Sequence, residues 1–331
     1  MTAADVPSFA LNNGSTVPSI GMGCWMGSPG GGERVKEMCD KALTVGYRHF
    51  DTASGYANEA KVGLAIAESG IPREQLYVTT KLWNGDHHRV REAFEESLAK
   101  LNCDYIDLYL MHWPQAVSAQ GVTLQADEYP TIIDTWKEME KLVDTGKVKS
   151  IGVSNFSIKT LTRLLPHCRI FPATNQVELH PYLPQTKLKA FCEERGILLT
   201  AYSPIGSPYA SSGGLDTTVP TLVADPTVQA IADKHGATPA QALINWAVQR
   251  NTIVIPKSEN LDRMTANITL VKLDDADMQA LNVLHERPGM HRSLLSSYHD
   301  NNGSVFGWTY EQLGWDMKLG GIVAEQSRSL L

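Results

Sequence analysis

Short apolar runs alternate with helical patterns along most of the chain. In each helical pattern the apolar residues recur every three or four positions, and each run between two helices is too short for a helix. Glycines such as Gly46, Gly146 and Gly196 follow the helical stretches, where helices commonly end. This alternation predicts an α/β protein with a parallel sheet. The predicted strands lie near residues 20–23, 48–51, 76–80, 105–111, 149–153, 174–178, 197–201 and 252–255.

The number of strands decides between two α/β architectures. Eight strands, each followed by a helical pattern, predict a (β/α)8 TIM barrel, whereas a doubly wound sheet usually has fewer strands and a dinucleotide-binding glycine motif. The glycine-rich stretch from Gly21 to Gly32 lacks that motif, because Met26 stands where the third glycine is required. We therefore expect one barrel domain over residues 1–331. Its helices are expected at 33–45, 59–68, 89–101, 131–144, 159–165, 187–195, 226–235, 239–249 and 261–267.

Both ends of the chain carry additions to this barrel. Two apolar runs flank Asn13-Gly14, a dipeptide typical of a type I′ turn, so an N-terminal β-hairpin is expected to plug one end of the barrel. Residues 286–331 lose the helical period but remain rich in aromatic residues. We expect them to form a C-terminal extension, a loop and a short helix, packed across one rim.

Composition and charge exclude several classes of protein. Hydrophobic residues make up 43% and charged residues 20% of the chain, which suits a globular protein with a large core. The net charge of −7 and the lack of a basic stripe argue against a nucleic-acid partner. Five cysteines without CxxC spacing indicate reduced thiols and no metal site, and no apolar run is long enough to span a membrane. A cytoplasmic monomer or weak dimer is expected.

Four titratable residues follow three consecutive predicted strands. Asp51 ends the second strand, Tyr56 lies in the loop behind it, Lys81 ends the third strand and His112 ends the fourth. The carboxyl ends of barrel strands form one functional rim, so these side chains are expected to converge. Lys81, held by Asp51, is expected to lower the pKa of Tyr56 from its ordinary value of about 10, which favours proton transfer. His112 would donate a second hydrogen bond to a carbonyl oxygen.

The motifs around these residues resemble those of the aldo-keto reductases. They occur in order over nearly the whole chain as GYRHFDTA (46–53), TKLW (80–83), DYIDLYLMHWP (104–114), GVSNF (152–156), NQVE (175–178), AYSP (201–204) and IPKS (255–258). The resemblance implies a barrel that binds NADP(H) without a Rossmann domain. It also implies a catalytic tetrad, which falls on Asp51, Tyr56, Lys81 and His112.

The same resemblance implies a set of cofactor and substrate contacts. Ser154, Asn155 and Gln176 match the family's contacts to the nicotinamide carboxamide, and Tyr202 matches the residue that stacks on the ring. At the other end of the cofactor, Ala266 replaces a glutamate that many relatives place beside the adenine. The 2′-phosphate contacts are implied for Lys257, Ser258 and Arg263, the adenine contact for Asn267, and the substrate pocket for Trp25, Trp83 and Trp113.

The expected reaction is the NADPH-dependent reduction of a small aldehyde. Two cations and a hydroxyl suit a phosphate dianion, which favours NADPH over NADH. The chain is similar to fungal sugar and sugar-acid reductases, so aldoses, glyceraldehyde and hexuronates such as D-galacturonate are candidate substrates. A substrate carboxylate could meet His87, His88, Arg89 or Arg292. The rim segments expected to select the substrate are 115–130, 206–224 and the tail after 286, with Arg292, Ser296, Tyr298 and His299.

Two alternatives from other classes remain open at this point. A protein with this architecture can bind the cofactor as a regulatory or sensor subunit and turn over slowly, and an intact tetrad does not exclude that role. A metal-dependent barrel hydrolase is the second alternative, although the histidines lack the spacing of a metal site.

Overall fold

Eight parallel strands form the centre of the molecule. The computed structural model describes residues 6–206, 221–295, 299–300 and 302–324. Within one sheet the strands follow one another in chain order, and each pairs in parallel with the next. All eight strands predicted from the apolar runs are confirmed. They are β3 (Met22–Gly23), β4 (His49–Asp51), β5 (Tyr77–Leu82), β6 (Ile106–Met111), β7 (Val148–Ser154), β8 (Thr174–Glu178), β9 (Leu198–Tyr202) and β10 (Ile253–Val254).

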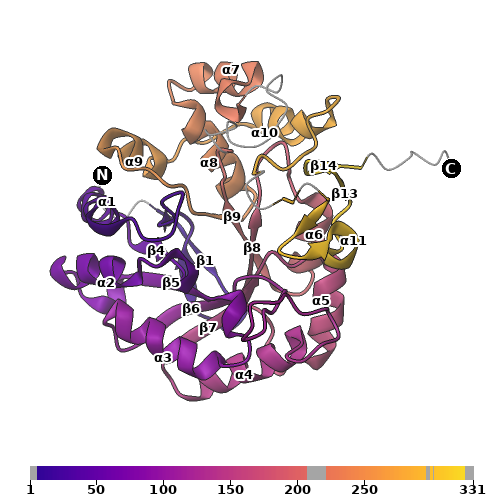
Figure 1. Ribbon diagram of the computed structural model, residues 1–331. Coiled ribbons are helices and arrows are strands. Elements are labelled where there is room, and N and C mark those ends of the chain that lie inside the picture. Colours follow the sequence, from indigo (N-terminus) through magenta and orange to yellow (C-terminus); the bar gives the residue numbers. More distant parts are fainter. Residues whose placement is uncertain (1–5, 207–220, 296–298, 301, 325–331) are drawn as a thin grey trace.

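The sheet closes on itself between its first and last strands. Ile20, just before β3, forms a parallel bridge with Val254 of β10. Two backbone hydrogen bonds of 2.8 Å fix this seam, from Val254 N to Ser19 O and from Gly21 N to Val254 O. Figure 1 shows the helices arranged around the strands. The predicted (β/α)8 barrel is therefore confirmed.

Helices follow the strands as the sequence predicts, with one addition. Side-chain caps define several starts: Thr131, Ser157 and Thr238 each accept a hydrogen bond from the backbone three residues later. The unpredicted helix α10 begins with the same device at Asp274. The helices are α1 (Gly32–Val45), α2 (Glu59–Glu68), α3 (Val90–Leu101), α4 (Ile132–Asp144), α5 (Ile158–Leu164), α6 (Thr186–Glu193), α7 (Pro226–Lys234), α8 (Pro239–Gln249), α9 (Leu261–Ile268), α10 (Asp275–Asn282) and α11 (Tyr310–Leu313).

The N-terminal hairpin is present, but its turn differs from the predicted one. β1 (Ser8–Ala10) pairs antiparallel with β2 (Thr16–Pro18), and Val17 packs with apolar residues at the starts of the barrel strands. The connection spans residues 11–15, and within it only Gly14 has a positive φ, 83°. A type I′ turn needs two such residues, so that prediction is wrong. Asn13 instead donates to Lys149 O (3.1 Å) and Ser150 Oγ (2.9 Å) on β7.

The described part of the C-terminal segment packs against the loop that follows β6. Trp308 Nε1 donates to Leu124 O, and Gln115 Nε2 donates to Val305 O, both at 2.7 Å. The segment contains α11 and four two-residue strands, β11 (Ser304–Val305), β12 (Trp308–Thr309), β13 (Met317–Lys318) and β14 (Ile322–Val323). Among the described residues, no helix is long and apolar enough to cross a membrane.

Candidate active site

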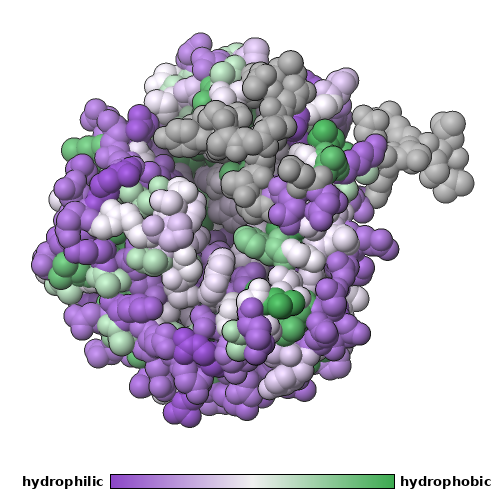
Figure 2. Space-filling model, viewed as in Figure 1, coloured by the Kyte–Doolittle hydropathy of each residue, from purple (hydrophilic) through white to green (hydrophobic). Residues whose placement is uncertain are grey.

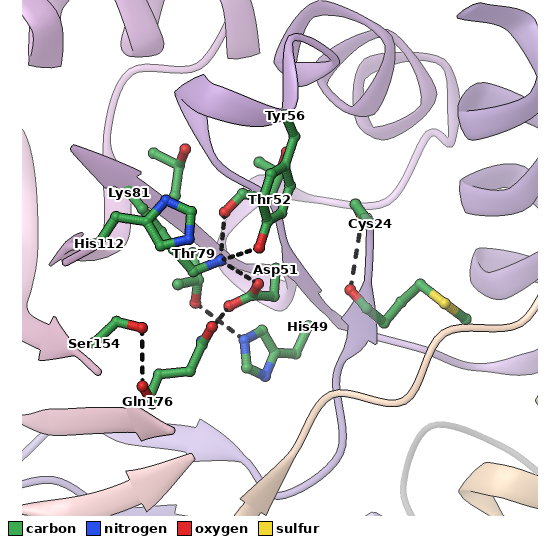
Figure 3. Close-up of polar contacts among 12 residues, drawn as sticks. Cys24, His49, Asp51, Thr52, Tyr56, Thr79, Lys81, His112, Ser154 and Gln176 are labelled. Atoms are coloured by element: carbon green, nitrogen blue, oxygen red, sulfur yellow. Dashed lines mark hydrogen bonds and ion pairs between the residues drawn. The ribbon is translucent and has the colours of Figure 1, made fainter. Parts of the chain in front are cut away.

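The barrel brings the four predicted catalytic residues to one rim. Asp51 is the last residue of β4, Lys81 lies one residue before the end of β5, and His112 follows β6 directly. Tyr56 ends a one-turn 3-10 helix, Ser54–Tyr56, in the loop after β4. Figure 3 shows the Lys81 ammonium group between Asp51, Thr52 and Tyr56, with His112 beside them.

Lys81 is a fully buried charge with three acceptors. Its Nζ donates to Asp51 Oδ1 at 2.5 Å, to Thr52 O at 2.8 Å and to Tyr56 Oη at 3.4 Å. The exposed fractions of the Lys81 and Asp51 side chains are 0% and 2%. Burial acts to lower the pKa of Lys81, but attraction to Asp51 and Tyr56 leaves that pKa raised. Lys81 is therefore a cation placed beside the tyrosine hydroxyl.

The second oxygen of Asp51 has its own partner. Gln176, on β8, donates from Nε2 to Asp51 Oδ2 at 2.7 Å. The resemblance predicted Gln176 as a nicotinamide contact, and the structure shows in addition that it holds the carboxylate that pairs with Lys81. The sequence contains no signal for this bond, because the two residues are 125 positions apart.

Tyr56 departs from the expectation about its acidity. Burial raises the pKa of the phenol, and the nearby Lys81 ammonium lowers it by less than burial raises it. The prediction that Lys81 leaves Tyr56 with a lowered pKa is therefore wrong for this structure. The effect of Lys81 has the predicted sign, but the loss of solvent outweighs it. At neutral pH the phenol keeps its proton, as a proton donor must.

His112 is a neutral histidine at the same rim. Burial lowers its pKa well below the ordinary value, and the positive charge of Lys81 lowers it further. Its ring packs edge-on against Tyr56 at 5.6 Å between centroids, and against Trp83 at 5.8 Å. Within the described part of the chain, Nδ1 has no hydrogen-bond partner. A neutral imidazole with one N–H can donate a single hydrogen bond to a carbonyl oxygen.

Aromatic side chains surround Tyr56 and His112. Trp25 lies 5.0 Å from Tyr56 between ring centroids, and Trp25 and Trp83 are 41% and 36% exposed. Trp113 is only 5% exposed, because Phe306 packs edge-on against it at 4.9 Å. Phe306 also contacts Trp83 at 6.3 Å, so the C-terminal segment contributes to this wall. Figure 2 shows a hollow at the centre of the face of the molecule that it displays.

The predicted nicotinamide contacts form one hydrogen-bonded group. Asn155, held at a φ of 63°, donates from Nδ2 to His112 O at 3.0 Å and accepts from Tyr202 Oη at 2.8 Å. Ser154 Oγ donates to Gln176 O at 2.8 Å. Since Gln176 also binds Asp51, the structure connects this group directly to the four-residue cluster.

The predicted 2′-phosphate contacts gather where α9 begins. Arg263 Nε donates to Ser258 Oγ at 3.4 Å, and Asn260 caps the helix by accepting from Arg263 N at 2.9 Å. The positive end of the helix dipole adds to the charges of Lys257 and Arg263, so this cluster suits a phosphate. Asn267, predicted to contact the adenine, is only 3% exposed. The sequence did not reveal Glu259, which accepts a hydrogen bond from Lys257.

Two of the four basic residues proposed to meet a substrate carboxylate, His87 and Arg89, have other partners, and His88 is exposed. His87 is 2% exposed, with Nδ1 3.2 Å from Thr135 Oγ1, and burial lowers its pKa to about 3. Arg89 pairs with Asp86 and Glu96. Arg292 is 4% exposed, and its Nε has no partner among the described residues. Residues 207–220, Ser296 and Tyr298 lie outside the described residues, while His299 Nδ1 lies 2.6 Å from Tyr310 Oη.

The fold and the site define the class of protein. It is a (β/α)8 barrel whose rim holds a protonated tyrosine between a buried cation and a neutral histidine, a group that can donate a proton to a carbonyl oxygen. The described residues include no group of three His, Cys, Asp or Glu side chains that could hold a metal ion.

Comparisons with known proteins agree with this class. A model of the Aldo/keto reductase family matches residues 19–286. The aldehyde reductase YPR1 of Saccharomyces cerevisiae is 39% identical over 86% of this chain and 93% of its own length. A D-galacturonate reductase of Hypocrea jecorina is 41% identical, over 83% and 89%. A Bombyx mori aldo-keto reductase, solved with NADP, superposes with a TM-score of 0.77 at 38% identity, covering 84% of this chain and 92% of that one. The chain belongs to the aldo/keto reductase family and is an oxidoreductase.

Proposed function

We propose that this enzyme uses NADPH to reduce the carbonyl group of a small aldehyde to an alcohol. The observation that carries the proposal is the Tyr56 hydroxyl, 3.4 Å from the buried Lys81 ammonium that Asp51 holds in place. His112, neutral and edge-on to Tyr56, supplies a second donor on the same side of the pocket. Together the two donors polarise a carbonyl oxygen and stabilise the charge that develops on it.

The proton and the hydride come from different sources. When bound, NADPH supplies a hydride to the carbonyl carbon. Tyr56 gives its proton to the carbonyl oxygen, and the phenolate left behind is stabilised by the positive charge of Lys81. A proton from solvent then restores the phenol. Asp51 keeps Lys81 charged and in position, and Gln176 holds the other oxygen of Asp51.

The residues expected to hold the cofactor fit a phosphorylated dinucleotide. Ser154, Asn155 and Gln176 present amide and hydroxyl groups beside the tetrad. Lys257 and Arg263, with the start of α9, offer positive charge for a 2′-phosphate. The Bombyx mori relative was solved with NADP, which supports the same cofactor here.

For the substrate we propose a sugar or a sugar acid, with hexuronates preferred to neutral aldoses. The exposed faces of Trp25 and Trp83 suit the apolar face of a sugar. The D-galacturonate reductase among the relatives supports a sugar acid. Arg292 is the residue that we propose to meet this carboxylate, since it is 4% exposed and its Nε has no partner among the described residues. A carboxylate matches a guanidinium group in charge and in hydrogen-bond geometry.

Two sugars that differ only at carbon 6 test this preference. D-Galacturonate carries a carboxylate where D-galactose carries a hydroxymethyl group, so NADPH oxidation with each isolates the contribution of the charge. We expect kcat/KM to be about ten- to a hundredfold higher for D-galacturonate, the range for a hydrogen bond to a charged group. In Arg292→Gln this advantage should disappear while kcat/KM for D-galactose stays the same.

Three other results would contradict parts of the proposal. Equal values for the two sugars would refute the uronate preference and leave aldehyde reduction standing. No NADPH oxidation with glyceraldehyde or any other aldehyde, despite NADPH binding, would refute the reductase function in favour of a regulatory or sensor role. Loss of activity with a chelator would indicate the metal-dependent hydrolase instead.

A further inference from the structure

A carboxylate lies among the cations expected to hold the 2′-phosphate of the cofactor. Glu259 is in the connection between β10 and α9. Lys257 Nζ donates to Glu259 Oε1 at 2.6 Å. Arg34, near the start of α1, donates from Nη2 to both carboxylate oxygens at 2.9 Å and from Nε to Oε2 at 3.1 Å. One oxygen of Glu259 thus accepts from two cations, Lys257 and Arg34, and Arg34 lies 225 residues from Glu259 in the chain.

Lys257 is therefore paired with a carboxylate of the protein itself, that of Glu259. The hydrogen bond from Lys257 lowers the pKa of Glu259, and the bonds from Arg34 lower it further, so the carboxylate is ionised at neutral pH. The Lys257 and Glu259 side chains are each 33% exposed, and Arg34 is 65% exposed. Water therefore screens the pair in part, and a ligand can reach it.

We propose that Glu259 is a specificity-determining residue that acts against the 2′-phosphate and so reduces the preference of the enzyme for NADPH over NADH. The proposal rests on the proposed function, since it takes Lys257 and Arg263 as the phosphate contacts. A phosphate dianion must share or displace the bond between Lys257 and Glu259, and it is repelled by the carboxylate. The uncharged ribose hydroxyl of NADH meets no such repulsion and can donate a hydrogen bond to a carboxylate, as in many NAD sites.

Binding of two adenosine nucleotides isolates this effect from catalysis. Adenosine 2′,5′-bisphosphate carries the 2′-phosphate and adenosine 5′-monophosphate lacks it, and calorimetry measures the dissociation constant of each. In Glu259→Gln the bisphosphate should bind about three- to tenfold more tightly, because a partly screened repulsion is removed. The monophosphate should bind no more tightly than to the wild type. The ratio of kcat/KM for NADPH to that for NADH should rise by a similar factor.

Two further variants separate this proposal from the proposed function. Glu33→Gln removes the same charge next to Arg34, but Glu33 pairs with Lys61, so bisphosphate binding should stay within about twofold of the wild type at physiological salt. Arg263→Ala should weaken bisphosphate binding and leave monophosphate binding unchanged. If Arg263→Ala has no effect, the phosphate site itself is wrong.

A different pair of results would refute the role of Glu259 and leave the phosphate site standing. In that case Arg263→Ala weakens bisphosphate binding, but Glu259→Gln binds the bisphosphate no more tightly than Glu33→Gln does. Glu259→Ala provides a second variant of the same residue. It should change bisphosphate binding in the same direction as Glu259→Gln, because both remove the charge.

Discussion

The Lys81 ammonium depends on three neighbours, and each of them contributes something that the others do not. Asp51 supplies the opposite charge, and Thr52 O and Tyr56 Oη accept the remaining protons. A buried charge without such partners is costly, so the pair stabilises the fold only while both members are present. The same arrangement places a positive charge where a tyrosine phenolate would form. Structure and chemistry therefore depend on the same contacts at this residue.

Removing one member of the pair should destabilise the protein more than removing both. Lys81→Met leaves the Asp51 carboxylate buried without its cation, and we expect the free energy of unfolding to fall by about 3–5 kcal/mol. In Asp51→Asn/Lys81→Met no charge is left unpaired, so the loss should be smaller than in the single variant. Urea unfolding of the wild type, the two single variants and the double variant measures the coupling. A double variant as unstable as the sum of the singles would show that the two charges do not interact.

At the scale of elements, the site is built from residues at the ends of successive barrel strands and in the loops that follow them. Because successive parallel strands end at the same rim, the ends of β4, β5 and β6 place Asp51, Lys81 and His112 side by side. This placement could be predicted from the sequence, because an apolar run that ends on a polar residue marks the end of a buried strand. The small elements of the C-terminal segment could not be predicted. Its strands are two residues long and have no period to detect, yet Phe306 reaches Trp83 and Trp113.

The prediction of turns and of short helices from the sequence is limited in the same way. The Asn13-Gly14 signal correctly indicated a hairpin but gave the wrong turn, because Asn13 finds acceptors on β7. Helix α10 is not among the predicted helices although Asp274 caps it, because the last predicted helical pattern ends at residue 267. Local signals predict that an element exists, and contacts with distant residues decide its details.

At the scale of the whole molecule, buried histidines connect stability to pH. Burial lowers the pKa of His49 to about 4 and that of His87 to about 3, whereas in the unfolded chain both have the ordinary value of about 6.5. As the pH falls below 6.5, the unfolded state binds protons that the folded state refuses. The free energy of unfolding should therefore fall from about pH 6.5 towards pH 4, by about 1.4 kcal/mol per pH unit for each of these histidines.

The contribution of a single histidine can be isolated by substitution. In His87→Asn the decline in unfolding free energy between about pH 6 and pH 4 should be shallower than in the wild type by roughly one histidine's share, ~1.4 kcal/mol per pH unit. His167→Asn serves as the control, because His167 is exposed. Urea unfolding at a series of pH values gives both slopes. Parallel curves for the wild type and His87→Asn would show that His87 is not held neutral by the fold.

The sequence could not predict those features of the site that depend on contacts between distant residues. The identities of the four clustered residues followed from strand ends and from the family's motifs. The net effect on the pKa of Tyr56 did not, because it depends on how far burial outweighs one nearby charge. The bond from Gln176 to Asp51 and the ion pair of Arg34 with Glu259 could not be predicted either. They join segments that are 125 and 225 residues apart.

In the proposed reaction Tyr56 delivers the proton to the carbonyl oxygen, and the variant Tyr56→Phe tests that role. The substitution removes one hydroxyl and keeps the ring against Trp25 and His112. With glyceraldehyde as substrate, kcat for NADPH oxidation should fall by about 10²–10⁴-fold, the usual contribution of a general acid, while the dissociation constant for NADPH stays the same. Tyr129→Phe, at a tyrosine that is 78% exposed, should retain full activity. Equal kcat values for Tyr56→Phe and the wild type would show that Tyr56 is not the proton donor.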